Sequence, residues 1–201
     1  NKEAYWAAGM NISNLGNKIS YTDAGEEHFL PMNARLGSSL FMELDDYNSV
    51  SFAFDVNKLL APTPPVYAVD EDNNPVFDEN DERVIEAGQD PNVGVLQGVF
   101  QSFTDAPGGM AEELNELMFS AGVEYWYLKQ FAFRGGYFYE HETKGNRKYI
   151  TLGLGMKMNV FSLDFSYLLP ATKGVRSPLA NTLRFTMLFD MAALYATDKQ
   201  N

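Results

Sequence analysis

The sequence lacks several features that would assign a class of protein at once. It has no cysteine among its 201 residues, so disulfide bonds and thiolate metal sites are excluded. No run approaches about 18 consecutive apolar residues, which excludes a membrane-spanning helix. Lys and Arg number 15 against 27 Asp and Glu, for a net charge of −12. Nucleic acid is therefore not expected as a partner, because its phosphates attract positive charge.

The chain begins at Asn1, with neither a starting methionine nor the charged and apolar parts of a signal peptide. We therefore expect a processed product or a fragment. Its length suits one domain or a large part of one, and we treat residues 1–201 as a single domain.

Most of the negative charge lies in one segment. Nine acidic residues between Asp70 and Asp90 stand against Arg83 alone, which gives a net charge of −8. Their spacing partly imitates a calcium-binding loop, with Asp70, Asp72, Asn74 and Asp81 as the candidate ligands. However, Pro75 stands where that loop needs glycine, and the bidentate glutamate is missing. The favoured interpretation is a solvated loop.

What the sequence has in abundance is an alternation of apolar and polar side chains. In residues 50–57, bulky side chains such as Phe52 and Phe54 alternate with small or polar ones such as Asp55. Because a β-strand points successive side chains to opposite faces, each such segment has one apolar and one polar face. Most run about ten residues, the length of a tilted strand that crosses a bilayer. We predict eight strands, at residues 4–13, 33–44, 49–59, 118–127, 131–140, 148–157, 160–169 and 182–190.

The direction of the apolar faces decides between a soluble and a membrane protein. The polar faces carry mid-strand charges, namely Arg35, Glu43, Asp55, Glu124, Arg134, Asp164 and Arg184. Such charges suit a water-filled lumen in which opposite charges pair, whereas a soluble barrel of the lipocalin kind would turn them to solvent. Short connections also alternate with long ones, as in outer-membrane barrels. We predict an all-β, antiparallel outer-membrane β-barrel with long extracellular loops, short periplasmic turns and a periplasmic C-terminus.

The longest connection, residues 60–117, is predicted to contain two short helices. Apolar side chains recur there at intervals of three and four residues, which indicates an amphipathic helix with Asn92 as its N-cap. This stripe consists of Val95, Leu96, Val99, Phe100 and Phe103, and a break at Pro107, Gly108 and Gly109 precedes the second helix. The stripe either packs its helix on the barrel rim or forms a lid, plug or partner-docking surface.

Nothing in the sequence specifies an enzyme. The two histidines, His28 and His141, lie in predicted loops, and no nucleophile-elbow pattern accompanies either. The pair Gly153 and Gly155 lacks the third glycine of a dinucleotide fingerprint. We therefore predict no catalytic residue, no cofactor and no metal site.

Several collinear motifs resemble those of the PorV family, also called LptO. They are NISN (11–14), KISYTD (18–23), DVNKLL (55–60) with PTPP (62–65), FTDAPGG (103–109), GGYFYEHETKGNRK (135–148) and PLANTLRF (178–185). PorV is the outer-membrane barrel of the Bacteroidetes type IX secretion system. The family resembles the FadL-type fatty-acid transporters, with about 14 strands. The resemblance implies that this chain holds the C-terminal eight strands. Residues 192–201, which follow the expected end of the last strand, depart from the family pattern.

The resemblance also implies a function and partners. PorV-like proteins associate with the SprA/Sov-type translocon barrel, receive secreted proteins by their C-terminal signal domain and carry them to an attachment complex. That complex contains the PorU sortase, which joins cargo to lipopolysaccharide. An extracellular apolar patch suits such docking. We expect Val95, Leu96, Val99, Phe100 and Phe103 to form it, with weaker contributions from Pro107, Gly108 and Gly109.

Two other classes of function stay open. A FadL-like transporter of hydrophobic molecules would need an apolar lumen pocket, and only Phe41 and Trp126 on otherwise polar faces suggest one. A factor in lipid A deacylation, which the LptO name reflects, would need a nucleophile near His28 or His141.

Overall fold

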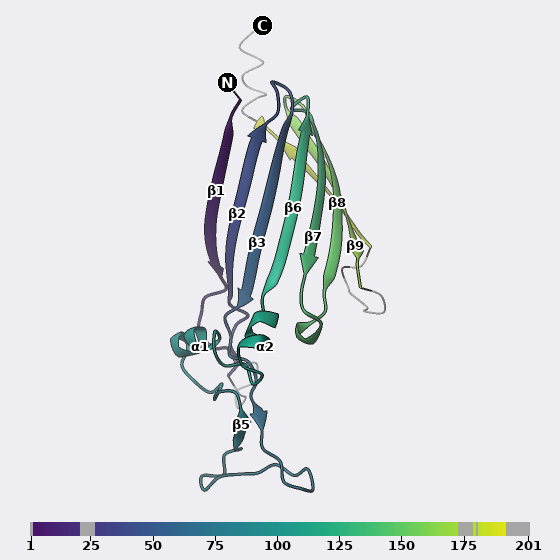
Figure 1. The fold of residues 1–201 in the computed structure, drawn as a ribbon. Helices are drawn as coiled ribbons and strands as arrows, with labels where there is room; N and C mark the ends of the chain where they lie inside the picture. Colours follow the sequence, from purple (N-terminus) through teal and green to yellow (C-terminus); the bar gives the residue numbers. More distant parts are fainter. Residues whose placement is uncertain (1, 21–26, 173–178, 180, 192–201) are drawn as a thin grey trace. The chain divides into compact units, whose positions relative to one another are not determined.

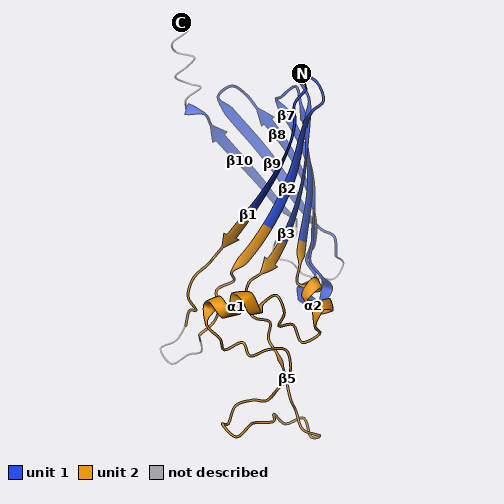
Figure 2. Ribbon diagram, turned by 60° about the vertical axis from the view of Figure 1, so that its left-hand side comes forward, with its two compact units in different colours: residues 1–9, 36–56, 119–201 blue, residues 10–35, 57–118 orange. Residues whose placement is uncertain are grey.

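A computed structural model of the chain describes residues 2–20, 27–172, 179 and 181–191 (Figure 1). The chain forms two compact units (Figure 2). Unit 1 comprises residues 1–9, 36–56 and 119–201, and unit 2 comprises residues 10–35 and 57–118. The predicted C-terminal extension, residues 192–201, lies outside the described residues.

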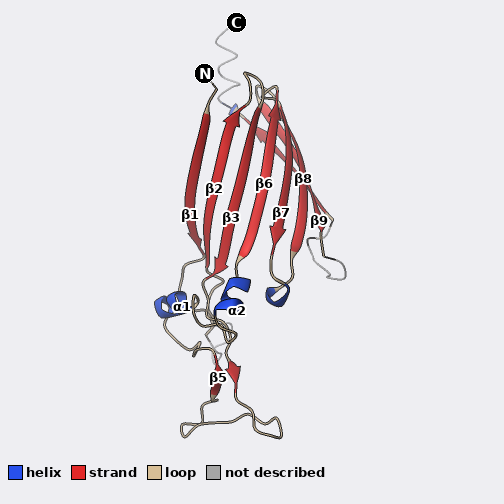
Figure 3. Ribbon diagram, viewed as in Figure 1, coloured by secondary structure: helices blue, strands red, loops and turns tan. Residues whose placement is uncertain are grey.

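All eight predicted strands are confirmed, each end within one residue of its prediction. They form one sheet in which neighbours in sequence pair (Figures 1 and 3). The strands, in sheet order, are β1 (Ala4–Ser13), β2 (Asn33–Glu43), β3 (Ser49–Leu59), β6 (Met118–Tyr127), β7 (Phe131–Tyr139), β8 (Lys148–Lys157), β9 (Phe161–Pro170) and β10 (Thr182–Phe189). Pairing is antiparallel from β6 through β10. The all-β, antiparallel class is thus confirmed, whereas closure into a barrel and further strands stay predictions.

In the central strands β6, β7 and β8 of unit 1, the apolar face is the more exposed one. Along β8, Leu152 and Leu154 are 53% and 55% exposed, whereas Thr151 and Gly153 are half-buried and Gly155 is buried. A soluble lipocalin-like barrel would show the opposite, because its apolar side chains fill the interior. The burial pattern is therefore the reverse of that expected for a soluble lipocalin-like barrel.

Few apolar side chains are buried among the described residues. These are Met32, Leu60, Ala106, Ala132 and Tyr149. In unit 2, Met32 and Leu60 are joined by a backbone hydrogen bond of 2.7 Å from the Leu60 N–H to the Met32 carbonyl oxygen. With so few buried apolar side chains, polar contacts contribute more to holding the segments of unit 2 together.

Unit 2 contains two short helices and a short hairpin between β3 and β6 (Figure 3). The hairpin pairs β4 (Val66–Tyr67) with β5 (Ile85–Ala87), and it was not predicted because its strands are too short for a periodic pattern. The helices are α1 (Val95–Gln101) and α2 (Met110–Asn115), at the two predicted places. Among the described residues, no helix combines the length and apolarity needed to cross a membrane.

The predicted N-cap of α1 is wrong. The N-cap is Gly94, which makes no side-chain capping hydrogen bond. Asn92 lies earlier, in a turn where its own N–H donates to Asp90 Oδ1 at 2.8 Å. Asn92 is therefore part of a turn held by Asp90, and the helix begins after this turn.

Candidate partner-binding site

Helix α1 exposes two large apolar side chains, Leu96 and Phe100, while Gly98 and Gln101 are buried. Leu96 and Phe100, four residues apart and so on one face of the helix, are 72% and 76% exposed. A surface helix normally turns its apolar stripe to the core. The exposed pair therefore forms an apolar surface that no described part of the chain covers.

Local contacts explain why the helix is held this way. A Cβ atom on Gly98 would lie 2.6 Å from ring atoms of Phe29 and 3.1 Å from Pro62 Cγ, so only glycine allows this close packing. On the same side, Gln101 Nε2 donates to the Asp90 carbonyl oxygen at 2.8 Å. Turning the apolar face inward would break both contacts.

The other predicted docking residues are placed differently. Val95 and Val99 are half-buried, whereas Phe103, just beyond the helix, is 48% exposed. The ring of Phe103 lies 5.6 Å from Lys58 Nζ, a cation–π distance. Met110 and Leu114 on α2 are also exposed. The sequence predicts both on a helix, but not as docking residues.

The predicted turn residues shape the chain between the helices. Pro107 is half-buried, and Gly108 and Gly109 are exposed. The Gly108 N–H donates to Glu112 Oε2 at 2.7 Å. Gly109, the residue before α2, has φ of +65° and ψ of −153°, a conformation that favours glycine. These contacts give the two glycines a structural role.

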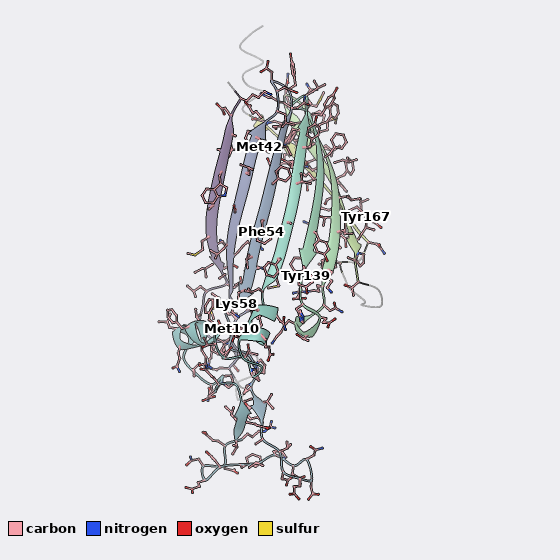
Figure 4. All side chains as sticks on the ribbon, in the orientation of Figure 1. Met42, Phe54, Lys58, Met110, Tyr139 and Tyr167 are labelled. Atoms are coloured by element: carbon pink, nitrogen blue, oxygen red, sulfur yellow. The ribbon has the colours of Figure 1, made fainter. Side chains whose placement is uncertain are left out.

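Near α2, unit 2 contains a buried polar cluster that we call the Lys58 hub. It consists of Lys58, Thr63, Asp105, Glu113 and Glu116 (Figure 4 labels Lys58 on β3 and Met110 on α2). Lys58 Nζ contacts Glu113 Oε2 at 3.1 Å and Glu116 Oε2 at 2.7 Å, with all three side chains no more than 13% exposed. One cation thus faces two buried carboxylates.

The hub joins four segments of unit 2. Glu113 Oε1 accepts the Ala106 N–H at 2.9 Å, which ties α2 to the preceding turn. Glu116 Oε1 accepts the Thr63 hydroxyl at 2.7 Å, which ties α2 to the proline-rich segment after β3. Asp105 Oδ2 accepts the Thr63 N–H at 3.0 Å. The end of β3, residues 62–65, the turn at 105–106 and α2 are therefore held by charged and hydrogen-bonding side chains.

Asp105 is the most unusual member of the hub. Its side chain is fully buried, and Oδ1 has no hydrogen-bond partner among the described residues. Its pKa is raised, chiefly because burial disfavours the charged form. The negative charges of Glu113 and Glu116 raise the pKa further, whereas the hydrogen bond from the Thr63 N–H lowers it.

The hub was not predicted from the sequence. Its partners are far apart in the chain, and their closeness depends on the path of a long loop. Two signals existed: Glu113 and Glu116 share a helix face by spacing, and Lys58, Thr63 and Asp105 each lie in a motif that carries the family resemblance. Three of those motifs meet at the hub.

On the polar face of unit 1, three of the seven predicted mid-strand charges form ion pairs with one another. The Arg134 guanidinium donates to Glu124 on β6 and to Asp164 on β9. Gly155 makes room for this ladder, because a Cβ there would lie 2.7 Å from Asp164 Oδ1 and 2.8 Å from Arg134 Nη1. Trp126 Nε1 donates to Glu124 Oε1 at 2.7 Å and joins the same network.

A hollow of about 690 Å³ lies beside this ladder, and its lining combines Asp55, Glu124, Arg134 and Asp164 with apolar side chains such as Tyr137, Phe138 and Leu152. The two hints of an apolar pocket have other partners. Trp126 hydrogen-bonds Glu124, and Phe41 stacks on Tyr5 with ring centroids 4.8 Å apart.

The remaining candidates have structural contacts. His141 Nδ1 accepts the Thr143 N–H at 3.3 Å and caps a 3₁₀ turn (Glu142–Lys144). His28 forms an isolated antiparallel bridge with Ile19. In the acidic segment, Asp70 Oδ1 accepts the N–H groups of residues 72 and 74, and the pKa of Asp70 is lowered mainly by hydrogen bonds from the backbone and the side chain of Asn74. Among the described residues, no His, Asp and Glu grouping has the spacing of a metal site.

Comparison with known proteins identifies one family. The model of the family described as "Type IX secretion system protein PorV" matches residues 1–66, which include Lys58 and Thr63 of the hub. No curated protein matches the chain. Over this matched part the chain is similar to the PorV family of type IX secretion system proteins, and the resemblance predicted from its motifs is confirmed.

Proposed function

We propose that the chain is an outer-membrane component of the type IX secretion system and acts there as a non-enzymatic carrier. It binds the C-terminal signal domain of secreted proteins at the SprA/Sov-type translocon barrel and delivers them to the attachment complex that includes the PorU sortase. The match to the PorV family over residues 1–66 supports the role in secretion. The outward-facing apolar side of α1 carries the proposal of docking.

The membrane setting belongs to the same proposal. The apolar face of strands β6, β7 and β8 is the more exposed one, as expected where lipid replaces a protein core. The polar face carries the Arg134 ladder, which suits an aqueous lumen. The eight strands form part of a FadL-like barrel of about 14 strands. Residues 60–117 then belong to a long extracellular loop, where secreted cargo and lipopolysaccharide are found.

A cargo domain gains affinity at α1 by removing exposed apolar surface from water. Full burial of a Leu or Phe side chain contributes about 1.5–3 kcal/mol. Leu96 and Phe100 are each about three-quarters exposed, so covering both contributes about 2–4 kcal/mol. That range corresponds to a dissociation constant changed by about 30-fold or more.

The test is quantitative binding of a cargo C-terminal signal domain to purified protein in mild detergent. We expect Leu96→Ser with Phe100→Ser to weaken binding by about 30-fold or more. The matched control is Val69→Ser with Phe77→Ser, which removes two exposed apolar side chains, 50% and 51% exposed, from the acidic segment. Equal affinities for the two double variants would refute docking at α1.

A second experiment tests the assignment to a secretion carrier. Affinity purification from outer membranes in mild detergent should recover a very large barrel together with secreted proteins. Recovery of bound fatty acid without protein partners would overturn the carrier and favour transport instead.

A further inference from the structure

The Lys58 hub buries more negative than positive charge. Lys58 faces Glu113 and Glu116 directly, and Asp105 lies in the same cluster, tied to Thr63. With all four groups ionised, three negative charges would share one buried cation. Burying an unpaired carboxylate costs several kcal/mol, so such a site favours a neutral carboxylic acid. Asp105 is the member whose second oxygen has no partner among the described residues.

The position of Asp105 makes it a structural link as well. It joins the proline-rich segment through the Thr63 N–H, and the next residue, Ala106, donates to Glu113 on α2. The chain just after β5 packs against Asp105 too, because a Cβ on Gly88 would lie 3.2 Å from the Asp105 carbonyl oxygen. Charge on Asp105 therefore acts where four segments of unit 2 meet.

We propose that Asp105 is the proton-carrying residue of a clasp that holds residues 60–66 against residues 104–117. With a neutral carboxyl group the clasp is closed, and loss of the proton places a third negative charge in the hub and loosens these segments. The strands of unit 1 are unaffected. The clasp does not depend on the proposed function, but it controls the order of the segment from which α1 is presented.

The direction of the pH dependence follows from proton linkage. The closed clasp holds the proton of Asp105 more tightly than the open one, whose Asp pKa is close to the ordinary value of about 3.9. Opening therefore becomes about tenfold more favourable per pH unit from about pH 4 upward, and levels off above the raised pKa of the closed state.

Hydrogen exchange of the whole protein in detergent isolates the Asp105 contribution. We would measure protection factors for peptides that contain the Thr63 and Ala106 amides, in wild type and Asp105→Asn, between pH 4 and 8. Asparagine keeps the acceptor for Thr63 but carries no charge. The wild-type to variant ratio removes any pH dependence that both proteins share. We expect this ratio to fall by about tenfold per pH unit and then level off, while amides of β7 to β9 stay unchanged.

Controls keep the proposal refutable. Glu71→Gln, an exposed acid outside the hub, should leave the profile as in wild type. A ratio that stays flat between pH 4 and 8, or an Asp105→Asn protein that opens more than wild type at every pH, would overturn the clasp. If Asp105→Asn does not assemble, Glu116→Gln replaces it: removing one negative charge should move the wild-type transition to lower pH, and an unmoved transition refutes the proposal.

Discussion

Replacing Lys58 by methionine tests whether the hub holds unit 2 together. Methionine keeps much of the stem length and the packing near Phe103 but removes the cation. The three paired side chains, Lys58, Glu113 and Glu116, are 8%, 6% and 13% exposed, so the ion pairs are buried rather than superficial. Removing one partner of a buried pair costs about 3–5 kcal/mol, because the other charge stays buried without compensation.

The assay is the free energy of local opening from native-state hydrogen exchange at the Ala106 amide, which donates to Glu113. We expect Lys58→Met to lower this free energy by about 3–5 kcal/mol. The matched control is the exposed pair of Lys129 and Glu43, where the two side chains are 59% and 25% exposed and 3.7 Å apart. There Lys129→Met should cost about 1 kcal/mol or less.

A compensated variant separates charge from packing. Adding Glu113→Gln and Glu116→Gln to Lys58→Met removes the stranded charges, while the amide oxygens still accept from Ala106 and Thr63. Most of the lost stability should return, because replacing a whole buried ion pair by neutral groups is often close to neutral. A Lys58→Met protein no less stable than Lys129→Met, or a triple variant as unstable as the single one, would refute the charge argument.

Two further predictions concern unit 1. Gly155→Ala should destabilise the sheet by about 1–3 kcal/mol in thermal unfolding, because the added Cβ would lie 2.7 Å from Asp164 Oδ1 and 2.8 Å from Arg134 Nη1. The control is Gly122→Ala, whose Cβ would have its nearest neighbour at 3.7 Å and which should cost less than half as much. Asp45 accepts hydrogen bonds within its own turn, chiefly from the Asn48 side chain, which lowers its pKa. The turn should therefore be protected above about pH 4 and lose protection as the pH falls, and Asp45→Ala should abolish that dependence.

The strands could be predicted from the sequence because their signal is local. A period of two over about ten residues needs no knowledge of distant contacts, and each of the eight ends within one residue of its prediction. The sequence also predicts which side chains share a face. Glu124, Arg134 and Asp164 lie on the polar face, where they pair with one another. Closure of the sheet into a barrel stays a prediction, because a local period of two does not say how many strands the sheet contains.

The candidate site was harder to predict, for a physical reason. The spacing of Val95, Leu96, Val99 and Phe100 correctly indicated a helix, but spacing does not say which side of a helix faces the core. Gly98 and Gln101 decide that, through contacts with Phe29, Pro62 and Asp90. The members of the hub carry no local pattern beyond two glutamates on one helix face.

Both the sheet and helix α1 expose large apolar side chains that a soluble protein would normally bury. We attribute this exposure to a different kind of contact in each case. In both, bulky apolar side chains such as Leu152 and Phe100 are exposed while glycines such as Gly155 and Gly98 are buried. The strands repeat this over a wide face, as a lipid boundary requires. In α1 the exposed face is two side chains wide, in a unit that carries the acidic segment with a net charge of −8. So small an apolar surface on a strongly charged unit suits a specific protein contact better than lipid, and the hub holds the adjoining segments in place.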